Sequence, residues 1–529
     1  MGVVLESTSL EWLSLGIILV SCVYLYYRNV FNFWKKKGVK YVEPVIPFGN
    51  SKELLMLRKS LAEFFKGFYD AFPNEPYMGI YEFNKPALLI RDPELIRQVL
   101  IKDFVHFQDR GVTYDEELEP LSAHLLFLTG SRWKNLRAKL TPTFTSGKIK
   151  MMYHLMEECA QQLKQSLDKP ATNQQMMEMK EVMAKFTTDV IGTCAFGLQF
   201  NAIENEDSEF RKMGRRVFTS SFRDTLVRII RTVCPSVLSL LKIKVMPQDI
   251  EDFFVGAVKE TVEYREKNNY IRNDFMQLLI QLKNKGRVHH DDVVVENLKN
   301  GSIYEEIHEK ATDIDFSDKL LTAQAFIFFL AGFETSSTTL SFCLYELALN
   351  PDIQDKLRDS IKAVVNKHGG KVTYDSLNDM PYLDKVVKET LRKHPPASFL
   401  VRNVTKPYVV PGTSLKLEAG LKVLISVYGM HRDAKYFPDP ERFNPENFSS
   451  EAKSARPHYS YLPFGEGPRI CIGKRFGLLQ TKLGLATLLL NYAFSVCEKT
   501  EIPLRLNPTQ FITSSSTGAW LRIKKCTTT

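Results

Sequence analysis

The chain has 529 residues, of which 44% are hydrophobic and 25% charged, and its formal net charge is +9. These proportions are ordinary for a globular protein and exclude a disordered, collagen-like or coiled-coil chain. We find no internal repeat and no Gly/Ser-rich or Pro-rich interior linker, so one large unit fits the length as well as several domains do. The small excess of positive charge forms no basic stripe, which argues against nucleic acid and fits a membrane surface or an acidic partner.

An uncharged run near the N-terminus predicts a membrane anchor. As a helix, Trp12 to Tyr27 spans about 24 Å, and apolar residues up to Trp34 extend it toward the ~30 Å of a bilayer core. Lysines and arginines follow the run and none precedes it, which places the rest of the chain on the cytosolic side. The eight cysteines form no CxxC pair, which is typical of that reducing compartment.

A cleaved secretory signal is the alternative for this segment. Such a signal has a positive start and a small-residue cleavage site, whereas this chain starts with Glu6 and Glu11 and continues with bulky aromatic residues. We therefore expect an uncleaved, single-pass anchor over residues 1–34. A short linker with two prolines over 35–50 and one main domain over 51–529 then follow.

The first elements after the linker are predicted to be a strand pair and a helix. Residues 77–91 have the pattern of a β-hairpin with its turn at Asn84-Lys85. Pro93 suits a first helical turn, and the helix is expected to run to about Lys102.

Helical periodicity then dominates. Apolar residues recur at helical spacing through 150–197 and 246–283. Residues 284–313 are polar and charged, so we expect an exposed loop in which His289 and His290 are solvated rather than bound to metal. The predicted fold class is mainly α with small β-sheets.

The longest predicted helix runs from about Phe316 to Leu349, capped by Asp315 or Ser317 and ended by the proline that follows. Its middle is apolar nearly all round, which predicts burial on every side. A second membrane span is the alternative, and the polar run that begins at Glu334 argues against it.

The sequence FGEGPRICIG at residues 464–473 is the strongest chemical signal. Its glycines allow tight turns and free backbone N–H groups to point at the sulfur. Those donors, Arg469 and the N-terminus of the next predicted helix favour a thiolate at Cys471. A lone cysteine would usually be an inert buried thiol, but this loop predicts a metal ligand or a nucleophile, and no histidine lies nearby to assist a nucleophile.

This loop resembles the cysteine loop of the haem-thiolate monooxygenases, the cytochromes P-450, at every fixed position of FxxGxRxCxG. The resemblance implies the fold of that family, a haem b cofactor and Cys471 as the iron ligand. It also implies that Arg469 meets a haem propionate and that Phe464, Gly465 and Gly473 form the cofactor-binding loop. A thiolate ligand pushes electron density onto iron and favours O–O cleavage.

Two further motifs of the family follow in the expected order. KETLR supplies Glu389 and Arg392, which lie one helical turn apart, and PERF supplies Arg442. An isolated ExxR would be a surface salt bridge of little value. In this context we expect Glu389, Arg392 and Arg442 to form a buried charge triad that supports the haem pocket.

The sequence AGFET at 331–335 resembles the oxygen groove of the family. By resemblance Ala331 and Gly332 approach the haem face, and Glu334 and Thr335 form an acid–alcohol pair that organises water for proton delivery. The alternative is a threonine bonded to its own helix.

Three more residues are expected at the haem propionates. Trp133 and Arg137 form the family's WxxxR pattern and lie one turn apart, and Arg402 in FLVRN matches another contact. Each alone would more often be an ordinary surface residue. Arginine suits the site because charge-assisted bonds to carboxylates are strong.

Electrons must come from elsewhere, because we find neither a GxGxxG fingerprint in a strand–helix setting nor a Walker loop. The resemblance implies a membrane-bound, NADPH-dependent flavoprotein reductase as partner, with cytochrome b5 as a possible second donor. The expected docking residues are basic and near the cysteine side of the haem: Arg132, Lys134, Lys139, Lys474 and Arg475.

FQDRG at 107–111 and the segments 120–133 and 140–152 look most like the insect microsomal branch associated with detoxification. We therefore expect oxidation of lipophilic foreign compounds at the endoplasmic reticulum membrane. The alternatives are a hormone or fatty-acid hydroxylase, a peroxide-rearranging enzyme and a haem-based binding or sensing protein. Substrate contacts expected by position are Leu121, His124, Phe127, Phe218, Phe222, Phe328, Ala331, Phe399, Leu400, Thr513 and Ser514.

Overall fold

A computed structural model describes residues 2–205, 208–218, 223, 226–227, 230–231, 234–285 and 316–526. Residues 286–313 of the expected loop, with His289 and His290, lie outside the described residues, and so does Phe222. The described chain is mainly helical with three small sheets, which confirms the predicted fold class.

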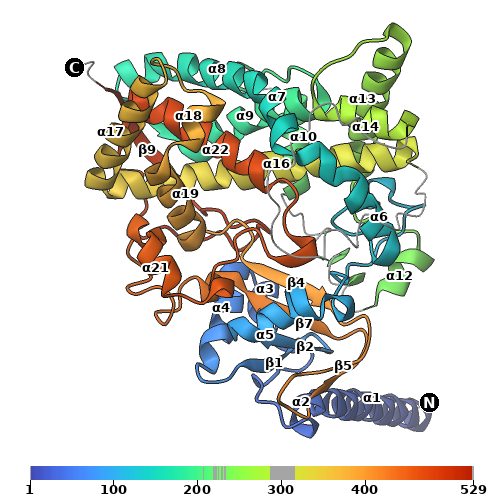
Figure 1. Ribbon diagram of the computed structural model, residues 1–529. Helices are drawn as coiled ribbons and strands as arrows, with labels where there is room; N and C mark the ends of the chain where they lie inside the picture. Colours follow the sequence, from blue (N-terminus) through green and yellow to red (C-terminus); the bar gives the residue numbers. More distant parts are fainter. Residues whose placement is uncertain are drawn as a thin grey trace.

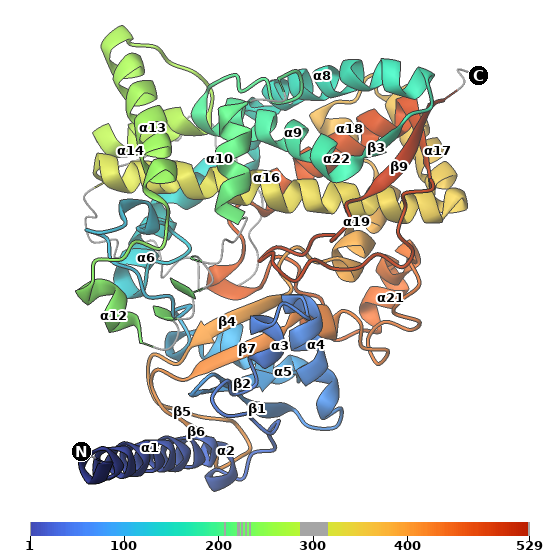
Figure 2. The same cartoon turned by 180° about the vertical axis from the view of Figure 1, so that it is seen from behind.

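A helical layer and a sheet region stack on one another (Figure 1). Four helices form the centre of the helical layer: α8 (Tyr153–Thr172), α9 (Met179–Ile191), α16 (Asp318–Leu349) and α22 (Lys474–Asn491). Figure 2 shows the same two layers from behind, with α16 running the length of the helical one. Their side chains merge into one large hydrophobic core.

Helix α16 confirms the predicted core helix. The Ser317 side chain accepts a hydrogen bond from the Leu320 backbone N–H and caps the start, and Asn350 ends the helix before Pro351. Most of its apolar window is buried inside the protein. A second membrane span is therefore the wrong interpretation of this segment.

The main sheet has the strand order β1-β2-β7-β4, with β2 and β7 parallel and the other pairs antiparallel. β1 (Tyr77–Glu82) and β2 (Lys85–Ile90) form the predicted hairpin, although the turn is at Phe83-Asn84, one residue earlier than expected. β7 (Lys422–Ser426) lies between β2 and β4, and β4 (Phe399–Asn403) is an edge strand. Phe399 pairs with Ser426 and Asn403 with Lys422, which sets the register of the edge strand that carries Arg402.

The sheet has its own hydrophobic core, covered by α4 (Leu61–Ala71), whose first turn is closed by a reciprocal Ser60–Glu63 capping box. The helix predicted from Pro93 is α5 (Pro93–Arg97), which continues as a π-helical turn, η1 (Gln98–Lys102).

Further α-helices of the described residues are α2 (Phe33–Lys36), α3 (Lys52–Leu55), α6 (Gly130–Leu140), α7 (Ser146–Met151), α10 (Glu209–Phe218), α12 (Pro235–Leu240), α13 (Gln248–Asn268), α14 (Phe275–Lys285), α17 (Pro351–Lys367), α18 (Tyr374–Asn378), α19 (Pro381–Lys393), α20 (Val427–Met430) and α21 (Ser450–Ser454). The short strands are β3 (Met176–Glu178), β5 (Tyr408–Val409), β6 (Lys416–Leu417), β8 (Tyr492–Ser495) and β9 (Trp520–Lys525).

Helix α1 (Gly2–Phe31) lies on the far side of the sheet from the helical layer (Figure 1). Its segment Glu11–Phe31 is long and apolar enough to cross a membrane and is not buried inside the protein. Trp34, directly after it, is completely buried, and its Nε1–H donates to the Ile80 carbonyl. The chain therefore contacts the sheet directly after the membrane-anchor candidate. Tyr41, in the expected linker, forms a β-bridge with Gly79 of β1.

Candidate active site

A cavity of about 1020 Å³ lies where the helical layer meets the sheet. Its wall comes from α6, α16, β4 and the loop before α22. Eleven of the expected site residues line it: Trp133, Arg137, Ala331, Gly332, Thr335, Arg402, Phe464, Gly465, Arg469, Cys471 and Gly473.

The cysteine loop turns tightly because two of its glycines have positive φ angles. Gly465 has φ +69°, and Gly467 has φ +74° with no room for a Cβ atom beside the Leu100 carbonyl. The Cys471 backbone N–H donates to the Phe464 carbonyl over 2.9 Å and closes the loop. Gly473 is the N-cap of α22, so the thiol sits directly before a helix N-terminus.

Cys471 is exposed, and it lines the cavity. Burial raises the pKa of the thiol, while the Gly473 backbone N–H and the charges of Arg137 and Arg110 oppose that rise. These donors and charges favour a thiolate once a positive centre binds the sulfur.

Two buried arginines, Arg402 and Arg469, and two half-buried ones, Arg110 and Arg137, line the same cavity. Burial, together with the charge of neighbouring guanidinium groups, lowers the pKa of Arg469 to about 8, of Arg402 to about 9 and of Arg110 to about 10. Arg469 is 3.4 Å from the Asp109 carboxylate and stacks over the Trp133 ring at 3.9 Å. The Arg402 Nε atom is buried without a hydrogen-bond partner among the described residues.

This donor set fits an anionic, flat ligand. Arginine keeps its proton in proteins, so a cluster of buried guanidinium groups is relieved by a bound anion rather than by deprotonation. The orphaned Arg402 Nε is the donor that such an anion would satisfy. A haem, with two carboxylates at one edge and an iron for the thiol at its centre, matches the wall and Cys471 together.

Arg110 is a site residue that the sequence reading missed. Its guanidinium donates to the Leu126 carbonyl over 3.1 Å and lines the cavity beside Arg469. Its only sequence signal is its place in FQDRG, which indicates a family likeness but no ligand contact.

The middle of α16 brings three of its four expected residues to the cavity. Ala331, Gly332 and Thr335 line it, and the Thr335 hydroxyl donates to the Ala331 carbonyl over 2.7 Å. Gly332 is required by a close approach of α9, because a Cβ atom there would lie 2.4 Å from the Ile191 side chain. The space that this glycine provides is thus used by a neighbouring helix.

Glu334 is absent from the residues that line the cavity, which corrects its expected pairing with Thr335. Its carboxylate lies 2.8 Å from the Lys180 Nζ atom on α9 and is 8% exposed. Lys180 also donates to the hydroxyls of Ser337 and Thr338, at 2.7 and 3.0 Å. The acid is therefore held in a buried ion pair between helices.

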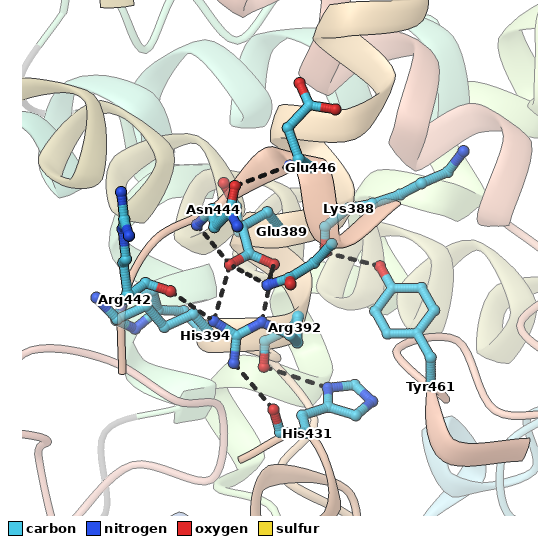
Figure 3. Close-up of polar contacts among 12 residues, drawn as sticks. Lys388, Glu389, Arg392, His394, His431, Arg442, Asn444, Glu446 and Tyr461 are labelled. Carbon is cyan, nitrogen blue, oxygen red and sulfur yellow. Dashed lines mark hydrogen bonds and ion pairs between the residues drawn. The ribbon is translucent and has the colours of Figure 1, made fainter. Parts of the chain in front are cut away.

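Glu389 and Arg392 form a fully buried ion pair joined by two hydrogen bonds of 2.8 Å (Figure 3). The carboxylate also accepts from the Asn444 backbone N–H over 2.8 Å and from the Asn447 side chain. Arg392 further donates to the His431 carbonyl over 2.9 Å.

Arg442 joins this network only through its backbone. Arg392 donates to the Arg442 carbonyl over 3.2 Å, while Arg442 itself is exposed, and Figure 3 shows its guanidinium turned away from Glu389. The expectation of a third buried charge at Arg442 is therefore wrong. The sequence analysis missed Asn447, the fourth residue after PERF, which stands third in a second P-E-x-F segment, residues 445–448.

Most of the expected substrate contacts are at the cavity. His124, Phe127, Phe218, Phe328, Ala331, Phe399 and Leu400 line it. Leu121, Thr513 and Ser514 do not line it. Of the expected docking residues, Arg132, Lys474 and Arg475 are exposed, and Arg132 pairs with Glu116 at 2.6 Å.

Comparisons with known proteins agree with this site. The sequence model of the family "Cytochrome P-450" matches residues 40–522. Cytochrome P-450 6a2 of Drosophila melanogaster is 42% identical over 510 residues, which cover 95% of this chain and 97% of that protein. Cytochromes P-450 6j1 and 6k1 of Blattella germanica are each 41% identical, over 505 and 512 residues, and cover 95% and 96% of this chain and the same shares of their own. The chain belongs to the cytochrome P-450 family and is a haem-thiolate monooxygenase of the insect detoxification type.

Proposed function

We propose that this protein oxidises neutral, lipophilic foreign compounds, such as plant toxins or insecticides, with electrons from NADPH delivered by a flavoprotein reductase. The observation that carries the proposal is Cys471, which lines a large cavity whose wall also contains arginines and several phenylalanines. A mostly apolar pocket with few polar groups accepts lipophilic molecules of several shapes.

Each group of the cavity wall has a role in this proposal. Cys471 would hold the iron of haem b, and Arg469, Arg402, Arg137 and Trp133 would hold its propionates. Arg110 is a further contact. Bound haem would activate dioxygen, and one of the two oxygen atoms would enter the substrate.

The residues of α16 control water and protons near the reacting atoms. The Thr335 hydroxyl donates to the Ala331 carbonyl, and Thr335 lines the cavity. Its oxygen can therefore still accept a hydrogen bond from water in the cavity. Glu334 affects proton supply indirectly, because its ion pair with Lys180 fixes this turn of α16 against α9.

The apolar N-terminal helix supports the same assignment. With α1 in the endoplasmic reticulum membrane and lysines directly after it, the domain faces the cytosol, where a membrane-bound reductase is available. The exposed Lys474 and Arg475 begin α22, one turn after Cys471, and suit an acidic face of the reductase or of cytochrome b5.

Reconstitution tests the proposal. The purified holoprotein is combined with an NADPH-dependent flavoprotein reductase and a panel of lipophilic plant compounds and insecticides, and the products are identified by mass spectrometry. Products that carry one added oxygen, formed only with NADPH and reductase, are expected. NADPH consumption without any oxidised product from the panel contradicts the proposal.

The reductase surface has its own test. Reversing Lys474 and Arg475 to glutamate should slow reduction of the haem several-fold at low salt and less at high salt, because screening weakens exposed charges. A rate that is equal to that of the unaltered protein at every salt concentration removes this surface from the proposal.

A further inference from the structure

One buried polar side chain of the cavity wall, His124, has no role in the cofactor contacts proposed above. His124 is 4% exposed and lines the cavity. Its ring lies 4.3 Å from the ring of Phe127, which also lines the cavity.

The imidazole of His124 lacks a partner that buried polar groups normally have. Its Nδ1 atom forms no hydrogen bond within the described part of the chain. Burial, together with the charge of Arg110, lowers the pKa of His124 to about 3, so the ring is neutral at physiological pH. A neutral imidazole carries one donor and one acceptor and can match either kind of group on a ligand.

The backbone on both sides of His124 is held in place by Gln324 of α16. The completely buried Gln324 side chain accepts from the Leu125 N–H over 2.9 Å and donates to the Ala123 carbonyl over 3.1 Å. From the cofactor side, Arg469 donates to the Leu128 carbonyl over 2.8 Å. The imidazole is therefore presented from a fixed segment, which limits the entropy lost when a ligand binds it.

We infer that His124 is a hydrogen-bonding anchor that selects lipophilic substrates carrying an uncharged oxygen or nitrogen group, such as a carbonyl, over hydrocarbons of the same shape. The inference rests on the proposed function and names a substrate class for the same cavity. The anchor orients the ligand, and the rest of the wall contributes apolar contact without a directional preference.

Matched ligand pairs test the inference without any redox step. The probes are 9-fluorenone with fluorene and xanthone with xanthene, which differ only in a carbonyl group against a methylene group. Dissociation constants are measured by equilibrium dialysis on the haem-loaded protein. In the unaltered protein the ketone of each pair should bind about 3- to 10-fold more tightly relative to its partitioning into an apolar solvent, as one net hydrogen bond predicts.

Three variants separate the anchor from general packing. His124→Leu should remove the preference for the ketone, and His124→Gln, which keeps a donor and an acceptor, should retain part of it. Phe127→Leu, the matched control, should change both members of a pair alike. The carbon-monoxide spectrum of each variant verifies haem loading, and if His124→Leu does not load haem, His124→Gln and His124→Met carry the comparison.

An unchanged ketone preference in the apolar His124 variant overturns the inference, and so does the lack of any preference in the unaltered protein. Failure of the proposed function gives a different result: the dialysis constants then follow the expected pattern while NADPH and reductase oxidise neither member of a pair.

Discussion

Glu389 and Arg392 are completely buried, and Arg402 and Arg469 are almost as deeply buried, yet the two sets of charge are arranged in opposite ways. The Glu389 carboxylate and the Arg392 guanidinium satisfy one another and are completed by backbone and amide groups of the same chain. Arg402 and Arg469 face a cavity, repel one another and leave a buried Nε atom without a partner among the described residues. A closed network supports the fold, whereas an open one is complete only when an anion arrives.

The largest effect is expected in the closed network. Glu389→Ala leaves the buried Arg392 without its counter-charge, which should lower the free energy of unfolding by about 3–5 kcal/mol and prevent haem loading. Urea denaturation and haem content measure both effects. Arg442→Ala is the matched control and should be nearly neutral, because that residue contributes only its carbonyl. A stable, fully loaded Glu389→Ala protein would show that the network is dispensable.

Removing one charge from the open set should not lower the free energy of unfolding of the protein without cofactor. Arg402→Leu relieves repulsion in the apoprotein, so its free energy of unfolding should stay equal or rise. Haem should bind more weakly by about 1.5–3 kcal/mol, the value of a charged hydrogen bond. Denaturation of the apoprotein and titration with haem test the two signs separately. An apoprotein that loses several kcal/mol would place Arg402 among the structural charges.

A pH titration sharpens the comparison, because His431 belongs to the closed network. Its Nε2 atom accepts from the Leu462 N–H over 2.9 Å, and burial, together with the charge of Arg392, lowers its pKa to about 3. Between about pH 6.5 and pH 3 the unfolded chain binds a proton that the folded chain refuses, so stability falls as the pH falls. The contribution of this residue should approach about 1.4 kcal/mol per pH unit.

Denaturation curves from pH 7 to pH 4 measure this slope. His431→Gln, which cannot take up the proton, should reduce the slope by the contribution of one group. An equal slope in the two proteins would assign the acid sensitivity to other groups, among them His124, whose pKa is also lowered to about 3.

The smallest effect on stability is expected at Thr335, whose hydroxyl bonds only to its own helix. Thr335→Ala should change the free energy of unfolding by less than about 1 kcal/mol. NADPH consumption should continue while product falls and hydrogen peroxide rises. Thr338→Ala, on the face of α16 that Lys180 contacts, should leave the ratio of product to NADPH consumed unchanged. An unaltered ratio of product to NADPH in Thr335→Ala counts against a role in proton delivery.

Much of this molecule was predictable because its signals are local. The apolar run of α16, its Ser317 cap and the glycines around Cys471 act within a few residues, and each formed as the sequence indicated. The motif residues at the cavity were predictable only by resemblance, since α6, β4 and the loop before α22 meet through the tertiary fold.

The misses have a common physical cause. Glu334 pairs with Lys180, a neighbour distant in sequence, and the Arg442 side chain is exposed rather than paired with Glu389. The roles of Arg110 and Asn447 likewise arise from contacts that no spacing along the chain encodes.

The carbon-monoxide spectrum of the reduced protein tests the central claim most directly. If Cys471 binds the haem iron as a thiolate, the reduced protein exposed to carbon monoxide should show the strongly red-shifted Soret band of that ligation, and Cys471→His should lose it. A band at the position typical of a neutral ligand in the unaltered, fully loaded protein would contradict the account.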